Sequence, residues 1–261
     1  MRTVRFLVVF VALLAQGGCA INRQPPLPPP GISREEKIKL GGWNQTIFIR
    51  GRNRANPLLL FVHGGPGLPE MPFSHVNADL ERDFTMVYWD QRGAGKSYSP
   101  DVPPATMNVN QVVRDTEELT RYLRSTFGQK KIYLVGFSYG TLISALAVSR
   151  HPEYYRAYVG ISQLTALERS ERMLYYAGIA RADRVGRADV ARQLRTVGPP
   201  PYARRHDERL ANKLKKESLP SLPLAMTPWR YLRMGIESPY YSIWDDINVL
   251  RGSNSLALFG S

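Results

Sequence analysis

Cysteine is almost absent from this chain of 261 residues, in which Cys19 is the only one. A single thiol cannot form an intramolecular disulfide, which excludes a small disulfide-stabilised scaffold. Long hydrophobic runs are also missing, because the apolar run at residues 6–14 is far shorter than the roughly 20 residues that cross a bilayer. A permanent transmembrane helix is therefore disfavoured, and the lack of internal repeats argues against a solenoid.

Acidic residues are scarce relative to basic ones, 22 against 35, which gives a formal net charge of +13. Such an excess suggests nucleic acid or an anionic membrane as a partner. The sequence has neither an aromatic-basic RNA motif nor a helix-turn-helix pattern, so we expect no nucleic-acid partner. Much of the excess lies at residues 169–216, where it either favours anionic lipid or keeps solvent-facing helices soluble. We expect the second.

A signal peptide is predicted at residues 1–20, where two arginines precede the apolar run and small residues follow it. Cys19, directly after two glycines, resembles a bacterial lipoprotein cleavage site. Gln16 departs from that pattern, which prefers an aliphatic residue there, and simple cleavage near Ala20 is the alternative. We expect an exported protein, periplasmic or anchored to the membrane through a lipid on Cys19. The proline-rich residues 21–32 should form an extended linker.

The middle of the chain has the pattern of a mostly parallel sheet. Residues 38–40 and 45–50 alternate apolar with polar side chains around a glycine pair, which predicts an antiparallel hairpin. Short continuous apolar runs predict further strands, each covered on both faces, at residues 58–62, 85–89, 132–135 and 157–161.

Helical spacing predicts two crossover helices between these strands. The first covers residues 109–127, with Gly128 placed to stop it. The second covers residues 141–150 and must end near His151, because Pro152 disfavours helical geometry at the residue before it. Strand, helix and strand therefore alternate, as in α/β proteins.

From about residue 164 onward this alternation is lost, and prolines interrupt charged, helix-like stretches. We interpret this region as a mostly helical cap. The predicted organisation is a core at residues 33–163, a cap at 164–250 and an incomplete return to the core at 251–261.

The clearest chemical signal is the pentapeptide GFSYG at residues 136–140, which follows a predicted strand and opens a predicted helix. This is the context of a nucleophile elbow, in which a serine occupies a sharp, strained turn and its neighbours must be small. We therefore predict Ser138 as a catalytic nucleophile. The alternative is a plain glycine-rich turn.

A second motif, HGGPG at residues 63–67, follows the strand predicted at 58–62. A glycine-rich turn there can direct backbone N–H groups at a developing oxyanion. Gly64 or Gly65, together with Tyr139 after the nucleophile, are the candidate donors.

A third segment, DQRGAGKS at residues 90–97, ends like a phosphate-binding Walker loop at Lys96 and Ser97. The complete loop needs a glycine where Asp90 stands, and the prolines that follow delay the next helix. An NTPase is therefore not expected.

Read together, the three motifs resemble the proline iminopeptidase branch of the α/β-hydrolase fold family, over roughly residues 40–165. The resemblance implies a mostly parallel sheet with flanking helices and a helical cap, and a serine enzyme that removes N-terminal residues, often proline, from short peptides. It implies no metal or organic cofactor. By the same resemblance, Asp90 and Arg92 are structural loop residues.

In that family, acidic side chains of the cap hold the substrate's ammonium group. Glu168, Glu171 and Glu237 are available here, but no motif selects among them, and exposure to solvent is the simpler interpretation of all three.

The triad acid and histidine of this fold follow the serine in the chain, after late strands. Among the histidines, His63 belongs to the HGGPG loop, His75 lies early and His151 precedes a proline, while His206 lies inside the predicted cap. None occupies the expected late position.

Two late carboxylates, Asp245 and Asp246, lack the strand and glycine turn that would present a triad acid, so we assign them to the cap. We expect a chain cut off before its final strands, with neither triad partner of Ser138.

Two other functions remain open. An esterase or lactonase would use the same elbow with a different cap, and its substrate would be a small ester. A non-catalytic, exported lipoprotein would use the fold only for binding. On this fold, epoxide hydrolases and dehalogenases resemble enzymes that use an aspartate at the elbow. A serine at that position therefore disfavours both activities.

Overall fold

The computed structural model describes residues 27–218, 233, 235 and 237–256. The predicted signal peptide and Cys19 lie outside these residues. Contacts divide the chain into two units, one formed by Met1–Gln163 with Pro228–Ser261 and the other by Leu164–Thr227. No helix within the described ranges is both long and apolar enough to cross a membrane.

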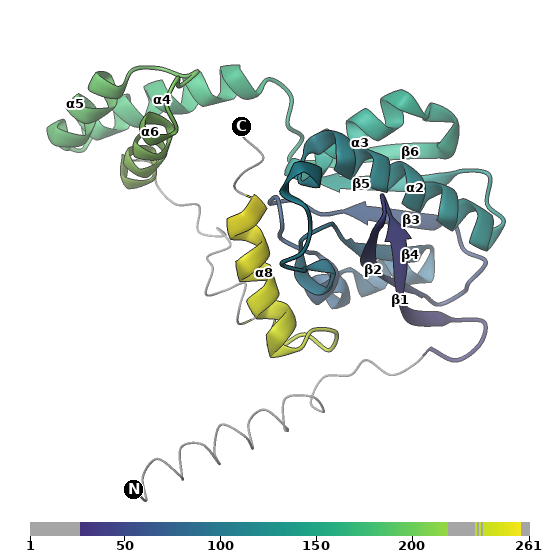
Figure 1. The fold of residues 1–261 in the computed structure, drawn as a ribbon. Coiled ribbons are helices and arrows are strands. Elements are labelled where there is room, and N and C mark those ends of the chain that lie inside the picture. Colours follow the sequence, from purple (N-terminus) through teal and green to yellow (C-terminus); the bar gives the residue numbers. More distant parts are fainter. Residues whose placement is uncertain (1–26, 219–232, 234, 236, 257–261) are drawn as a thin grey trace, which may run out of the picture. The chain divides into compact units, whose positions relative to one another are not determined.

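The first unit is built on a six-stranded sheet with the order β1-β2-β4-β3-β5-β6 (Figure 1). Strands β1 (Ile32–Leu40) and β2 (Trp43–Gly51) form the predicted antiparallel hairpin, in which Gly41 and Gly42 adopt positive φ angles at the turn. Strand β2 also pairs antiparallel with β4. The remaining pairs are parallel, which confirms the mostly parallel sheet. The strands in question are β3 (Leu58–Val62), β4 (Thr85–Asp90), β5 (Ile132–Phe137) and β6 (Tyr155–Ile161).

Helices α2 (Val109–Phe127) and α3 (Tyr139–Arg150) confirm the two predicted crossovers. The side chain of Asn108 caps α2 by accepting a 2.9 Å hydrogen bond from the Gln111 N–H, and Gly128, at φ 64°, ends the helix in left-handed geometry. Both helices contribute to one apolar cluster with the sheet. They lie side by side (Figure 1).

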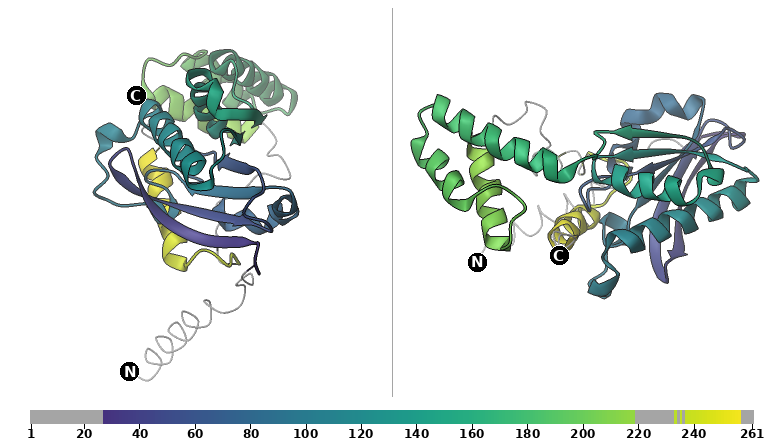
Figure 2. Two further views of the ribbon diagram at one scale, coloured as in Figure 1. Left: turned by 90° about the vertical axis from the view of Figure 1, so that its right-hand side faces the viewer. Right: turned by 90° about the horizontal axis from the view of Figure 1, so that it is seen from above.

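The opposite face of the sheet is covered by segments that the sequence pattern did not reveal. One is η1 (Met71–Arg82), a run of 3-10 helix, which lies across the sheet from α2 and α3 (Figure 2). Met71 and Phe73 from η1, and Tyr241 and Val249 from the late part of the chain, form a second apolar cluster with Phe61 and its neighbours. Shorter 3-10 turns are η2 (Gly95–Ser97), η3 (Pro104–Thr106) and η4 (Pro152–Tyr154).

Strand β6 differs from the prediction that residues 157–161 are covered on both faces. Val159 is 53% exposed and Ile161 is 42% exposed. Because strand side chains point to the faces of the sheet, their exposure means that no described segment covers these positions of β6, the last strand in the sheet order.

The second unit consists of three helices, α4 (Leu167–Arg184), α5 (Ala188–Val197) and α6 (Arg205–Ser218). They enclose a small apolar cluster of their own, which includes Tyr175 and Leu194. This unit starts where we predicted the cap to start but ends at Thr227, before the predicted boundary at 250. Helix α8 (Ile243–Leu256), which includes residues 251–256, groups with the first unit instead. Asp245 and Asp246 therefore belong to the first unit, and their assignment to the cap was wrong.

Candidate functional site

Ser138 lies at the sharp turn between β5 and α3, with φ 50° and ψ −118°. Such a backbone conformation costs a non-glycine residue about 1–3 kcal/mol, so the surrounding structure must hold it. The Ser138 N–H donates to the carbonyl oxygen of Ile161 at 2.9 Å. Thr141 donates to the Ser138 carbonyl through its N–H at 2.9 Å and its hydroxyl at 2.6 Å. The turn is thus anchored on both sides, and the serine side chain stays partly exposed.

The glycines on either side of Ser138 are required by close packing. A Cβ atom built on Gly136 would lie 2.8 Å from both the Gly140 carbonyl oxygen and Ser144 Oγ. A Cβ on Gly140 would overlap the carbonyl oxygen of Val62. Any larger residue at either position would displace backbone, so the motif has the geometry that an elbow needs.

The HGGPG loop packs directly against this elbow. A Cβ on Gly64 would lie 2.8 Å from the Phe137 carbonyl oxygen and 3.1 Å from Ser138 Cβ, and Gly65 has φ 115°. Tyr139 is the first residue of α3 and directly follows Ser138. The structure therefore places the three candidate oxyanion donors on the two segments that meet at Ser138.

His63, although next to Gly64, is held as a structural residue. Its Nδ1 lies 2.9 Å from the Gly64 carbonyl oxygen, and its Nε2 accepts a 3.1 Å hydrogen bond from the Gln91 N–H. These partners fix a neutral ring with the proton on Nδ1. Burial lowers the pKa of His63 to about 4, with the Gly64 hydrogen bond opposing the effect. His63 has no lone pair left to act as a base.

The other three histidines lie outside the HGGPG loop. His75 is exposed on η1, and His206 is exposed on α6 of the second unit. His151 follows the last residue of α3, about 18 Å of helix away from Ser138, and lies 3.1 Å from Glu153. Within the described part of the chain, Ser138 Oγ has no hydrogen-bond partner.

The DQRGAGKS segment is mostly buried, and its polar side chains make structural contacts. The carboxylate of Asp90 accepts from the Lys96 N–H at 2.8 Å and from the Tyr241 hydroxyl. Burial raises its pKa to about 7. The Lys96 ammonium lies 3.0 Å from Glu35 and 3.6 Å from Asp245. Lys96 is therefore engaged in ion pairs and does not act as the lysine of a phosphate-binding loop.

Arg92 and Asp115 form a fully buried ion pair, with their side chains 1% and 0% exposed. Two parallel hydrogen bonds of 2.9 and 3.0 Å join them, and Gln45 and Gln111 also donate to the carboxylate at 2.8 Å each. The network connects the loop after β4 to α2, so Arg92 has a structural role.

The three glutamates proposed to hold an amine are all in ion pairs. Glu168 pairs with Arg172 at 3.1 Å and Glu171 with Lys215 at 2.6 Å, both within the second unit. In the first unit, Glu237 pairs with Arg233 at 3.0 Å.

Two carboxyl groups of the first unit have environments that the sequence did not reveal. Glu70 follows the HGGPG loop, and burial raises its pKa to about 7. Asp246 is 2% exposed, and neither of its oxygens has a hydrogen-bond partner in the described structure. Glu70 lies in no motif that could have revealed it, whereas Asp246 was considered and assigned to the cap. The described residues hold no cluster of His, Cys, Asp and Glu suited to a metal ion.

Comparison with known proteins gives the family. The family model described as the alpha/beta hydrolase fold matches residues 57–241, which include both the elbow and the HGGPG loop. The chain belongs to the α/β-hydrolase fold family. The matched region reaches from the residue before β3 into the segment before α8.

Within this α/β-hydrolase family, the chain is similar to proteins named as aminopeptidases. A probable aminopeptidase, YbaC, from Bacillus subtilis (strain 168) is 35% identical over 173 residues, or 66% of this chain and 54% of that protein. A proline iminopeptidase from Lactobacillus helveticus is 26% identical over 162 residues, or 60% of this chain and 54% of that protein. The chain thus spans about half the length of these curated relatives.

Among solved structures, a proline iminopeptidase-related protein from Thermus thermophilus matches with a TM-score of 0.52 and 19% identity. The match covers 87% of this chain and 71% of that one. At this low sequence identity, the similarity shows the fold alone.

Proposed function

We propose that Ser138 is the nucleophile of a serine hydrolase that releases N-terminal residues, proline or similar, from short peptides. The observation that carries the proposal is the backbone of Ser138 at φ 50°, anchored by Thr141 and Ile161, with the Gly64 loop packed against it. The names of the similar proteins, an aminopeptidase and a proline iminopeptidase, support the substrate class.

In the proposed reaction, Ser138 Oγ attacks the carbonyl carbon of the first peptide bond and its proton passes to a base. Backbone N–H groups from Gly64 or Gly65 and from Tyr139 stabilise the resulting oxyanion. The C–N bond then breaks, the leaving amine takes the proton, and water hydrolyses the acyl-enzyme. His63, with both ring nitrogens in hydrogen bonds, and His151, beyond the far end of α3, are not placed to be that base.

A second candidate is a binding protein in which Ser138 is not activated. It is favoured by one observation, that no described residue hydrogen-bonds to Ser138 Oγ. An unactivated serine hydroxyl is a poor nucleophile.

Fluorophosphonate labelling of the full chain separates the two, because this probe reacts with activated serines. The hydrolase proposal expects labelling that is lost in Ser138→Ala and kept in Ser162→Ala, a serine close to the elbow. Loss of labelling in His206→Ala as well would identify the base. A folded chain that is not labelled would leave the binding role as the better explanation.

If the chain is labelled, a panel of aryl amides of proline and alanine beside small esters defines the substrate class. Cleavage of the amides with a free amino group supports the aminopeptidase. Cleavage of the esters alone would replace it with an esterase or lactonase.

We also propose that the protein is exported and tethered through a lipid on Cys19. The support is the order of charged, apolar and small residues before Cys19 and the proline-rich segment after it. A tethered enzyme would meet its peptide or ester substrates outside the cytoplasm.

A further inference from the structure

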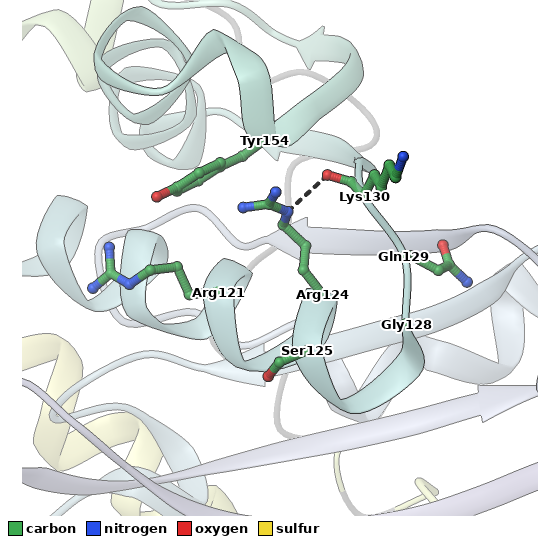
Figure 3. Close-up of a pocket in the computed structure, with 7 residues that line it drawn as sticks. All are labelled: Arg121, Arg124, Ser125, Gly128, Gln129, Lys130 and Tyr154. Atoms are coloured by element: carbon green, nitrogen blue, oxygen red, sulfur yellow. Dashed lines mark hydrogen bonds between the residues drawn. The ribbon is translucent and has the colours of Figure 1, made fainter.

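A basic pocket lies at the C-terminal end of α2, the end opposite Asn108, and is well removed from Ser138. It has a volume of about 380 Å³ and is lined by Arg121, Arg124, Ser125, Gly128, Gln129, Lys130 and Tyr154 (Figure 3). The pocket borders the start of β5, whereas Ser138 follows the end of that strand, about 20 Å away along it. The pocket is therefore separate from the candidate catalytic site.

Arg124 is held in place by two contacts. Its Nε donates a 2.8 Å hydrogen bond to the Lys130 carbonyl oxygen, and its guanidinium lies 4.1 Å from the centre of the Tyr154 ring. The Tyr154 ring also stacks on His151, with the rings 4.6 Å apart and nearly parallel. Because a cation–π contact and a hydrogen bond both fix the side chain, little conformational entropy remains to be lost when its terminal NH2 groups bind a ligand.

Gln129, which also lines the pocket, is equally fixed. The Gln129 side chain accepts from the Leu58 N–H at 3.0 Å and donates to the Asn56 carbonyl oxygen at 2.9 Å. The N–H of Gln129 caps the Arg124 carbonyl at 3.0 Å, so this end of α2 exposes fewer carbonyl oxygens that would repel an anion. The pocket is thus preformed.

The basic side chains that line the pocket form no direct ion pair in the described structure. Arg121, one turn before Arg124 on the same face of α2, Arg124 itself and Lys130 take part in no ion pair of the described structure. No carboxylate lines the pocket. The nearby Glu153 lies 3.1 Å from His151, and its pKa is lowered by hydrogen bonds to its own backbone and to His151 and, in smaller part, by the charge of Arg124. Figure 3 shows the Lys130 ammonium extending away from the Arg124 guanidinium, so Lys130 adds charge more than a direct contact.

We propose that this pocket binds a phosphate group through Arg121 and Arg124, with the Tyr154 hydroxyl as a further donor. Planar guanidinium groups match the geometry of phosphate oxygens and bind them by charge-assisted hydrogen bonds. The phosphate belongs either to a lipid headgroup or to a free phosphate ester. The two share a phosphate group with negatively charged oxygens, which is what the arginines would bind. Because the site is open to solvent, its binding weakens as salt rises.

The test is a titration of the full chain with inorganic phosphate at constant ionic strength, followed by the NMR signal of the Arg124 Nε–H. We expect saturable shifts, and about tenfold weaker binding in Arg121→Gln, which corresponds to roughly 1.4 kcal/mol. Arg121 is exposed, so this variant should fold as the parent does, which circular dichroism checks. Arg114→Gln removes the same charge from an exposed position of α2 outside the pocket and should bind as the parent does.

Vesicles of phosphatidylglycerol, with phosphatidylcholine vesicles as the reference, identify the source. Sedimentation with the anionic vesicles that Arg121→Gln loses would assign the site to a lipid headgroup. Saturable phosphate binding without sedimentation would assign it to a free phosphate ester. Shifts that never saturate, or equal weakening in Arg121→Gln and Arg114→Gln, would overturn the proposal. None of these outcomes depends on whether Ser138 is catalytic.

Discussion

Gly64 lies directly against Ser138, so closely that a Cβ atom built on Gly64 would come within 3.1 Å of Ser138 Cβ. This contact joins the loop after β3 to the turn after β5, two neighbouring parallel strands. Since parallel strands end at the same edge of the sheet, the register of β3 and β5 places the two motifs together. The separation of the motifs in sequence does not reveal how tight this contact is.

Replacing Gly64 with alanine should therefore disturb both segments. The added methyl group would also lie 2.8 Å from the Phe137 carbonyl oxygen, and neither backbone segment can move without strain. We expect a loss of about 1–3 kcal/mol in the free energy of unfolding, and weaker labelling of Ser138 if it is labelled at all. Urea denaturation measures the first effect.

Gly178→Ala is the matched control, because its Cβ would meet only side-chain atoms, at 3.3 Å and beyond, on helix α4. Alanine favours a helix over glycine, so this variant should be neutral or more stable. Equal stability of the two variants would show that the Gly64 contact is not tight.

The buried pair of Arg92 and Asp115 predicts a large stability effect. Asp115→Ala would leave the guanidinium of Arg92 buried without its counter-charge and would remove an acceptor from Gln45 and Gln111. Breaking a buried ion pair in this way costs about 3–5 kcal/mol. The exposed pair of Glu168 and Arg172 provides the control, since Glu168→Ala should cost no more than about 0.5 kcal/mol. Chemical denaturation of both variants would refute the argument if their losses were similar.

Lipid attachment can be tested at Cys19 alone. The parent chain, expressed in a bacterium with a lipoprotein pathway, should incorporate labelled fatty acid and sediment with membranes. Cys19→Ser removes the acceptor thiol and should do neither, while export itself continues. Fatty-acid incorporation that persists in Cys19→Ser would show that another residue carries the lipid, and its absence from the parent would favour simple cleavage near Ala20.

The elements that the sequence predicted well are those with local signals. The glycine pair at 41 and 42 sets the hairpin, Gly128 ends α2, and the apolar runs delimit the strands. Helix α2 contains all the apolar positions from which it was predicted, and it ends just before Gly128 as expected. The elbow was recognisable for the same reason, because its strand, small residues and helix are adjacent in the chain.

The features that escaped prediction depend on contacts between distant segments. The side chains of η1 have no clear period, and Met71 and Phe73 are buried only because the sheet lies beneath them. The placement of α8 with the first unit depends on Tyr241. Its hydroxyl donates a hydrogen bond to Asp90, which lies 151 positions earlier in the chain. The exposure of β6 was missed because an apolar run looks the same whether or not another layer covers it.

The adjacent carboxyl groups of Asp245 and Asp246 should respond oppositely to amidation. Burial raises the pKa of Asp246 to about 7 from its ordinary value of 3.8, with Asp245 adding to the rise. Because the folded state favours the neutral acid, its contribution to stability is full below pH 3.8 and is lost as the pH rises through about 7. Asp246→Asn, which stays neutral, should therefore be about 2 kcal/mol more stable than the parent at about pH 8 and should differ little near pH 4.

Asp245 has the partners that Asp246 lacks. Its carboxylate accepts hydrogen bonds of 2.8 Å from the N–H and the hydroxyl of Ser242 at the start of α8, and it lies 3.6 Å from the Lys96 ammonium. Asp245→Asn removes a charge from the helix start and from the ion pair, so we expect a loss of about 0.5–1 kcal/mol at about pH 8. Thermal unfolding across this pH range compares the two variants. A parent-like pH dependence in Asp246→Asn would mean that Asp246 is solvated and ionised in the folded protein, and that α8 packs less closely on the first unit than its buried residues indicate.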